Sequence, residues 1–224
     1  MVEFSKQKIA AEECAYIKDG GIYWKNNAGE KKILDVAEIK LRGAHNQANI
    51  LAAVAVAGIL GINAKMTKKG IIEFTGTPHR LELVRTLTGV SYYNDSAATT
   101  PESAICGIKS FSEPLVLICG GANKNLDVSI LADEIVKNKN IKKAVFLAGE
   151  STDKIIEALK KTVVAGQVGF PVANSMAEAI KLARQEAVAG DVVLLSPGAA
   201  SFGMFINEFD RGNQFRELVM ALKR

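Results

Sequence analysis

Short apolar runs alternate with helical patterns over residues 83–222, and this alternation constrains the fold more than any other feature of the sequence. Neighbouring parallel strands need long crossover connections, which are usually helices, so the pattern predicts an α/β fold with a mostly parallel sheet and helices on both faces. We expect strands at 83–87, 90–93, 115–119, 143–147, 168–172 and 192–195, and helices at 101–111, 128–136, 152–162, 176–189 and 213–222.

The first 76 residues follow a different pattern. Residues 1–40 contain three short strand-like segments separated by turn residues, and three short strands cannot bury their own faces. We therefore expect them to form the edge of a larger sheet. Residues 45–60 predict an Ala-rich helix that is apolar nearly all round and should be buried. Gly76 and Pro78 then mark a hinge before the α/β pattern begins.

Three polar loops each follow an expected strand. They are YYNDSAATT (92–100), GGANKN (120–125) and SPGAASFG (196–203). Thr100 and Pro101 are typical of an N-cap and a first helical residue. Ligands of open α/β sheets bind beyond the carboxyl ends of the strands, so the three loops predict one site. We expect it to hold a small anionic substrate beside a nucleotide.

Each loop offers polar groups with more than one interpretation. Lys124 offers three donors and a charge to a carboxylate or phosphate, or it is a solvated loop lysine. Ser201 and the amides of 198–203 form an anion-binding nest or a flexible turn. Asp95, Ser96 and Thr99 bind ribose, a carboxylate or water, or they only cap turns.

Two arginines near these loops leave alternatives open as well. Arg80 follows the hinge and would either reach a phosphate or pair with Glu82. Arg211 precedes the last expected helix, where it would serve only as a helix-entry residue.

Composition excludes several classes of function. Net charge is +4 from 28 basic and 24 acidic residues, the basic residues are scattered, and aromatic residues are only 6%, which does not predict a nucleic-acid interface. No apolar run approaches the length of a membrane span. Three cysteines without metal-ligand spacing fit a reducing, cytoplasmic location. The motifs GxxxxGK[ST], HExxH and GxSxG are absent from these 224 residues, which argues against independent nucleotide hydrolysis or metalloprotease chemistry.

Five stretches, taken in order, resemble the C-terminal half of the Mur ligases, and most closely the members that add D-glutamate. They are GAHNQAN (43–49), FTGTPHRLE (74–82), NDSAATTPES (94–103), GGANKNLD (120–127) and LLSPGAASFGMFINEFDRG (194–212). The resemblance implies that residues 1–76 are the C-terminal part of a central ATPase domain. It also implies that residues 77–224 are a complete Rossmann-like C-terminal domain.

The resemblance also implies a reaction of peptidoglycan precursor synthesis. ATP phosphorylates the carboxylate of UDP-N-acetylmuramoyl-L-alanine, and the amine of D-glutamate attacks the acyl phosphate. The family's phosphate loop and its carbamylated lysine, which binds Mg²⁺, have no counterpart in this sequence. We therefore expect a fragment that uses ATP and Mg²⁺ only with those parts, and that is inactive alone.

The resemblance assigns roles to individual residues. For the nucleotide, Asn46 and Asn49 would lie near the adenine, Arg80 near the phosphates and Asp95 near the ribose.

For D-glutamate, Thr99 and Lys124 would hold one carboxylate. Ser201, the backbone of Phe202 and a backbone group near Glu208 or Phe209 would hold the other.

The sequence departs from the family pattern at three positions, where Ala97 replaces a frequent Lys, Gly203 a frequent Asp, and Glu208 a usual aromatic residue. A sister Mur ligase or a folylpolyglutamate synthase stays an alternative, although GGANKN and SPGAASFG argue against it. Another is a truncated, non-catalytic binding module. An N-terminal segment cut from a larger domain would be expected to expose an apolar face.

Overall fold

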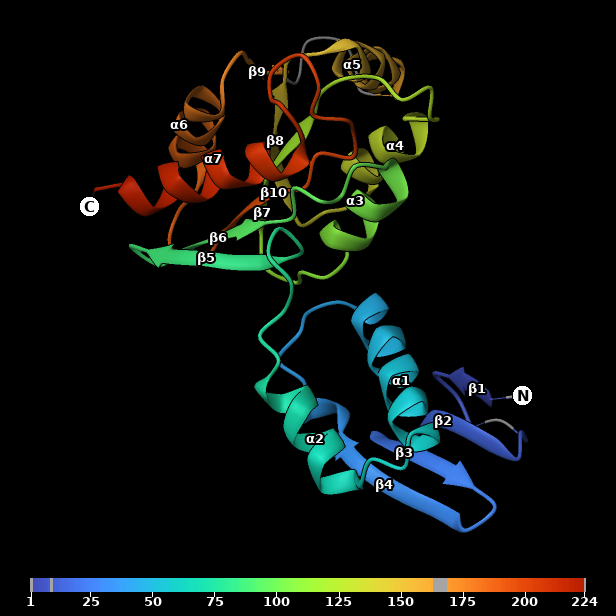
Figure 1. Ribbon diagram of the computed structural model, residues 1–224. Coiled ribbons are helices and arrows are strands. Elements are labelled where there is room, and N and C mark those ends of the chain that lie inside the picture. Colours follow the sequence, from blue (N-terminus) through green and yellow to red (C-terminus); the bar gives the residue numbers. More distant parts are fainter. Residues whose placement is uncertain (1, 9, 163–168, 224) are drawn as a thin grey trace. The chain divides into compact units, whose positions relative to one another are not determined.

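The computed structural model describes residues 2–8, 10–162 and 169–223 (Figure 1). The chain divides into two compact units, Met1–Gly76 and Thr77–Arg224, and each is described here by itself.

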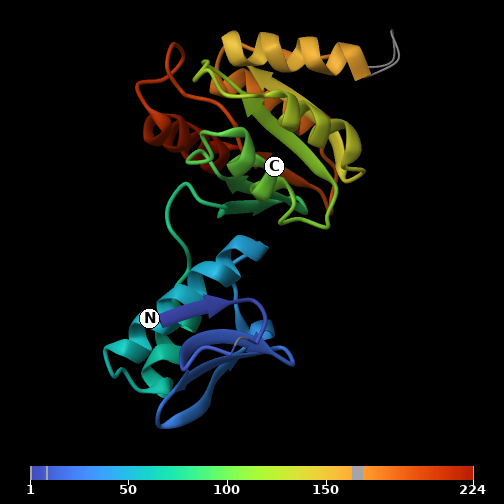
Figure 2. The same ribbon diagram turned by 90° about the vertical axis from the view of Figure 1, so that its right-hand side faces the viewer.

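The N-terminal unit is a four-stranded sheet with two helices. Its strands lie in the order β1-β2-β3-β4, with β1 parallel to β2 and the other pairs antiparallel. The helix α1 packs against β1, β2 and β3, and α2 packs against β4, as Figures 1 and 2 show. The elements are β1 (Val2–Ser5), β2 (Glu13–Lys18), β3 (Gly21–Asn26), β4 (Gly29–Asp35), the 3₁₀ turn η1 (Val36–Glu38), α1 (Ala44–Ile59) and α2 (Ala64–Glu73).

A core lies between the sheet and α1. Residues from β2, β3 and β4, among them Ile22, Trp24 and Leu34, are buried with Leu51 and Val54 of α1. The missing partner of the short strands is therefore supplied by α1, together with the strand β1 that the sequence pattern did not reveal.

The helix α1 is not buried all round, in contrast to the prediction. Only one of its faces meets the sheet, while Val56 and Ile59 on other faces are 54% and 59% exposed. Leu60, Ile62 and Met66 beyond it are exposed as well. The N-terminal unit thus exposes several large apolar side chains.

The C-terminal unit is a six-stranded sheet in the order β5-β6-β10-β7-β8-β9. Only the β5–β6 hairpin is antiparallel. The predicted α/β class with a mostly parallel sheet is confirmed. Its strands are β5 (Glu82–Leu87), β6 (Val90–Asn94), β7 (Leu115–Gly120), β8 (Ile141–Leu147), β9 (Val172–Ala173) and β10 (Val192–Leu195), and its helices are α3 (Pro101–Ile108), α4 (Ser129–Lys137), α5 (Glu150–Thr162), α6 (Met176–Glu186) and α7 (Glu208–Ala221).

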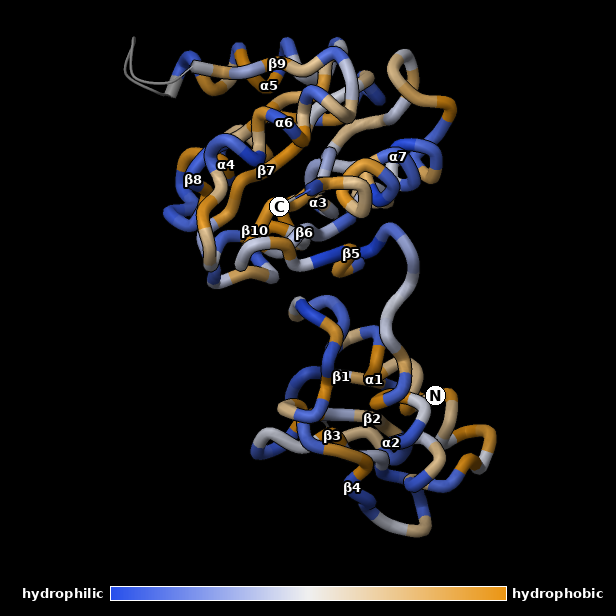
Figure 3. The backbone as a smooth tube through the Cα atoms, turned by 90° about the vertical axis from the view of Figure 1, so that its left-hand side faces the viewer, coloured by the Kyte–Doolittle hydropathy of each residue, from blue (hydrophilic) through white to orange (hydrophobic). Residues whose placement is uncertain are grey.

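Helices cover both faces of this sheet, with α6 and α7 on one side and α3, α4 and α5 on the other (Figure 1). Successive residues of a strand point to opposite faces. Val116 and Ile118 accordingly join the core under α6 and α7, while Leu117 and Cys119 join the core under α3 to α5. The central strands β7 and β10 are therefore apolar throughout, which Figure 3 shows as continuous orange.

Several elements differ from the sequence prediction. The expected strand 168–172 includes residue 168, which lies outside the described residues, and the strand β9 is found at Val172–Ala173. The helix α2 was not predicted. The last helix begins at Glu208 and not at 213, because Asn207 caps it by accepting hydrogen bonds from the amides of Phe209 and Asp210. Among the described residues, no helix combines the length and the apolar character needed to cross a membrane.

Candidate functional site

The three polar loops lie side by side because the strands that precede them are neighbours. In the sheet, β10 lies between β6 and β7, and Leu195 is in register with Asn94 on one side and Ile118 on the other. All three strands are parallel, so their carboxyl ends reach the same edge. The loops after residues 94, 120 and 195 therefore leave the sheet together, as the sequence predicts.

Backbone hydrogen bonds join these loops to one another. The amide of Gly198 donates to Ala98 O over 2.9 Å, and the amide of Gly120 donates to Pro197 O over 2.7 Å. Beyond the sheet, Ala122 and Ala200 exchange two bonds of 3.0 and 3.1 Å. The loop that carries Lys124 and the loop that carries Ser201 are thus fixed to each other.

Gly121 makes this close approach possible. Its φ is +136°, and a Cβ at this position would lie 2.5 Å from the carbonyl oxygen of Ala200. Only glycine combines this backbone conformation with so short a distance. The contact between the two loops therefore requires glycine at position 121.

Lys124 and Thr99, both predicted to hold one carboxylate, meet in the structure. The Lys124 ammonium donates to Thr99 Oγ1 over 3.1 Å, although the two residues belong to loops on different strands. Lys124 remains exposed to solvent and Thr99 is half-buried. A cation and a hydroxyl placed side by side are suited to a carboxylate ligand.

Ser201 and Phe202 follow directly after the Ala122–Ala200 bridge. Ser201 is buried and its carbonyl accepts the amide of Phe205 over 3.1 Å, whereas the Phe202 side chain is 62% exposed. The loop is therefore folded back on itself, with one residue turned inward and the next turned to solvent. The predicted second anion-holding segment is thus attached to the segment that carries Lys124.

Arg211 holds two of the loops through buried hydrogen bonds, a role that was not predicted from the sequence. Its side chain is completely buried within α7. The guanidinium donates to Ser96 Oγ (2.9 Å), Ser96 O (2.8 Å) and Ala199 O (3.1 Å). Burial lowers the pKa of Arg211 to about 10, which is still high enough to leave the side chain charged at neutral pH. The expectation of a helix-entry residue is wrong because α7 begins before it.

Asp95 is buried in the same layer. Its Oδ2 accepts from Ser196 Oγ over 2.8 Å and its Oδ1 accepts from the amide of Leu81 over 3.2 Å. Burial raises its pKa to about 6, against the opposing effects of the Ser196 and Leu81 hydrogen bonds and the charge of Arg80. Both oxygens thus have protein partners, and the predicted ribose contact stays a prediction.

Arg80 is exposed and lies between two residues of left-handed backbone, His79 (φ 63°) and Leu81 (φ 44°). Among the described residues, Glu82 does not form the alternative salt bridge with Arg80. Glu82 Oε2 accepts from the His79 amide over 2.9 Å and from Asn94 Nδ2 over 3.1 Å.

Asn46 and Asn49 belong to the N-terminal unit, in the first turns of α1. Gly43 is the N-cap residue of α1. Asn46 Nδ2 donates to Arg42 O over 2.7 Å, and Asn49 Nδ2 donates to Asn46 Oδ1 over 3.2 Å. Their expected place near adenine stays a prediction.

Metal ligands are not gathered in the part of the chain that the structure describes. No group of three or more His, Cys, Asp or Glu side chains is arranged there to hold an ion.

Comparison with protein families gives a direct match. The family model described as "Mur ligase, glutamate ligase domain" matches residues 79–198, which is more than half of the chain.

Curated relatives extend the similarity to both units. A protein of Roseiflexus sp. named UDP-N-acetylmuramoylalanine--D-glutamate ligase is 41% identical over 210 residues, covering 93% of this chain and 44% of the relative. A protein of the same name from Thermoanaerobacter sp. is 40% identical over 223 residues, covering 99% of this chain and 48% of the relative. The chain thus spans about half the length of these relatives.

Solved structures share the fold at low sequence identity. The UDP-N-acetylmuramate-alanine ligase of Thermotoga maritima has a TM-score of 0.63 at 18% identity, covering 91% of this chain and 44% of that protein. The Mycobacterium tuberculosis folylpolyglutamate synthase complexed with ADP also has a TM-score of 0.63, at 17% identity, covering 93% and 47%. Together with the family match over residues 79–198, these findings show that the chain belongs to the Mur ligase family, through its glutamate ligase domain.

Proposed function

We propose that this chain carries the amino-acid site and part of the ATP site of an ATP-dependent ligase that adds D-glutamate to UDP-N-acetylmuramoyl-L-alanine in cytoplasmic peptidoglycan synthesis. The observation that carries the proposal is the Lys124–Thr99 hydrogen bond at a sheet edge where three loops are joined. The names of the relatives that are about 40% identical support the choice of D-glutamate.

D-Glutamate has two carboxylates, and the joined loops offer two places for them. Lys124 and Thr99 would take one through charge-assisted hydrogen bonds, each contributing roughly 1.5–3 kcal/mol. Ser201 with the backbone of Phe202 and the start of α7 would take the other. Because the Ala122–Ala200 bridge fixes the two places to each other, the site would select an amino acid by the separation of its carboxylates.

The contribution of these residues to the reaction would be positioning. Holding both carboxylates leaves the amine directed toward an acyl phosphate formed elsewhere in the protein, which lowers the barrier through orientation. Arg80, Asn46 and Asn49 would contact ATP. Mg²⁺ would be held mainly by the family's carbamylated lysine, which has no counterpart in this sequence.

We assign the two units to two parts of such a ligase. Residues 1–76 would be the C-terminal part of the central ATP-binding domain, and residues 77–224 the C-terminal domain. Because the sequence has no phosphate loop, we expect no ADP formation by this chain alone.

Calorimetric titration with D-glutamate tests the proposal. We expect saturable binding of D-glutamate, at least tenfold weaker binding of L-glutamate, and loss of binding in Lys124→Ala. Lys137→Ala is the matched control, because that lysine is exposed and pairs with Asp133 in its own helix. Preference for another amino acid would favour a sister ligase or a folylpolyglutamate synthase, and absence of any saturable binding would contradict the proposed site.

A further inference from the structure

The backbone around Arg80 adopts a conformation that side chains rarely permit. His79 and Leu81, on either side of it, have φ values of 63° and 44°. Left-handed backbone is uncommon for residues other than glycine, and it persists only where surrounding contacts enforce it. Such positions cluster at functional sites, so the contacts that hold the backbone of residues 79–81 point to a functional role.

Four hydrogen bonds hold the backbone of the corner, which we define as residues 79–81. The His79 amide donates to Glu82 Oε2 over 2.9 Å, and the His79 carbonyl accepts the amide of Ala97 over 3.0 Å. The Arg80 amide donates to Thr77 O over 3.2 Å. The Leu81 amide donates to Asp95 Oδ1 over 3.2 Å. Each residue of the corner is thus tied to the rest of the unit.

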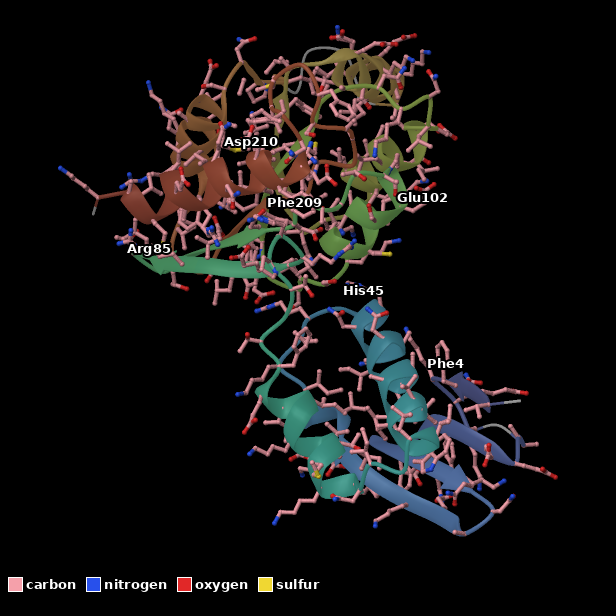
Figure 4. All side chains as sticks on the ribbon, in the orientation of Figure 1. Phe4, His45, Arg85, Glu102, Phe209 and Asp210 are labelled. Atoms are coloured by element: carbon pink, nitrogen blue, oxygen red, sulfur yellow. The ribbon has the colours of Figure 1, made fainter. Side chains whose placement is uncertain are left out.

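The His79 ring anchors the corner from inside. It is buried, and its Nδ1 lies 2.9 Å from Asn94 Nδ2. The Ser96 amide donates to Asn94 Oδ1, which identifies Nδ2 as the amide nitrogen and Nδ1 as the acceptor. Burial also lowers the pKa of His79, in keeping with a neutral ring. Phe209 belongs to the first turn of α7 (Figure 4). Its ring packs edge-on against the His79 ring, with centroids 5.8 Å apart.

Gly212 provides the space for this ring. A Cβ on Gly212 would lie 2.2 Å from His79 Nδ1, and the carbonyl of Gly212 accepts from Asn94 Nδ2 over 3.2 Å. A glycine in the interior of a helix is unfavourable for the helix itself. Its place in α7 is explained by the ring that packs against it.

Arg80, in contrast to its neighbours, is exposed. We propose that His79, Asn94 and Gly212 are positioning residues that fix the corner 79–81 and thereby present the Arg80 guanidinium to an anionic phosphate chain. The inference rests on the proposed function for the anion that Arg80 would contact, the triphosphate of ATP. The three residues do not touch the anion and act through the backbone on either side of Arg80.

Nuclear magnetic resonance of the labelled chain tests both parts of the inference. Relaxation gives the order parameters of the Arg80 amide and Nε–H, and titration with inorganic tripolyphosphate gives a dissociation constant from the Arg80 signals. The variants are Gly212→Ala and Glu82→Ala, with Glu82→Gln as the conservative control, because glutamine keeps an oxygen for the His79 amide. Arg80→Ala removes the proposed contact itself. Spectral dispersion checks that each variant is folded.

We expect a rigid Arg80 amide in the original chain, with an order parameter of about 0.85, that falls below about 0.6 in Gly212→Ala and Glu82→Ala. Tripolyphosphate binding should weaken at least tenfold in those variants and in Arg80→Ala, and Glu82→Gln should stay within twofold of the original chain. If Gly212→Ala does not fold, the comparison of Glu82→Ala with Glu82→Gln tests the inference.

Two results would overturn the inference. One is an Arg80 amide that is already mobile in the original chain. The other is tripolyphosphate binding that is absent, or that does not change when the corner loosens. D-Glutamate binding by the original chain reports separately on the proposed function, because Lys124 and Thr99 make none of the four hydrogen bonds that hold the corner.

Discussion

Arg211 Nε lies 2.9 Å from Ser96 Oγ, and the same hydroxyl donates to the carbonyl of Glu208 over 2.7 Å. A residue of the loop after β6 is thereby bound to the first turns of α7. The guanidinium reaches the loop after β10 as well, through Ala199 O. One buried cation therefore fixes the supports of both predicted carboxylate-holding loops.

Replacing Arg211 should cost much of the stability of the C-terminal unit. Arg211→Met leaves the carbonyls of Ser96 and Ala199 without their donor, and each buried acceptor left unsatisfied costs about 1–3 kcal/mol. Arg211→Lys should recover only part, because an ammonium cannot reproduce the planar fork. Urea unfolding measures both.

Arg216→Met is the control for this loss, since Arg216 is exposed on the same helix. It should change stability by no more than about 0.5 kcal/mol. Equal effects of the two methionine variants would contradict the role assigned to Arg211.

Asp95 should make stability depend on pH in a direction opposite to that of most carboxylates. Burial raises its pKa from the ordinary 3.8 to about 6, so its contribution is fully present below pH 3.8 and is lost as pH rises through about 6. Asp95→Asn cannot ionise and escapes that loss. The stability of the variant relative to the original chain should rise by roughly 3 kcal/mol between pH 3.5 and pH 8.

Unfolding by denaturant at several pH values measures this difference, and other titrating groups cancel in the comparison. A difference that is constant across the range would show that Asp95 ionises normally in the folded protein.

Gly121→Ala should disrupt the junction of the two substrate loops. Its Cβ would meet Ala200 O at 2.5 Å, and its φ of +136° already disfavours any side chain. We expect a loss of more than about 2 kcal/mol, combining steric overlap with backbone strain. Gly203→Ala separates these effects, because its φ is +89° with no atom near the added Cβ, and should cost only about 1–2 kcal/mol. A larger loss in Gly203→Ala than in Gly121→Ala would contradict the account of the junction.

The arrangement of the loops was within reach of the sequence, because it follows from strand order and direction alone. Apolar runs followed by polar loops predict a parallel sheet, and a parallel sheet gathers loops at one edge. That Lys124 and Thr99 would meet came from the resemblance to the Mur ligases, and the structure joins them.

The buried polar contacts could not be predicted from the sequence. Gly212 is a poor helix former, so the last helix was expected to start after it, yet Asn207 caps a helix that includes it. The signal for Arg211 was its spacing from Phe215 and Val219, which places all three on one buried face of a helix. Asp95 lies in a loop, and nothing in the nearby sequence reveals that Ser196 and Leu81 donate hydrogen bonds to its carboxylate.

The helix α1 shows a different difficulty. Its composition indicated burial on every side, but periodicity cannot tell how many faces have partners. Within the described chain only the face with Leu51 and Val54 has a sheet to cover it.

The most direct test of the central claim is to follow the backbone amides of the ¹⁵N-labelled chain during titration with D-glutamate. If the joined loops form one dicarboxylate site, the amides of residues 99, 124, 201 and 202 shift together with a single dissociation constant, and L-glutamate leaves them in place. Shifts confined to one loop, or found only outside the three loops, would contradict the claim that Lys124 and Ser201 hold the two ends of one substrate.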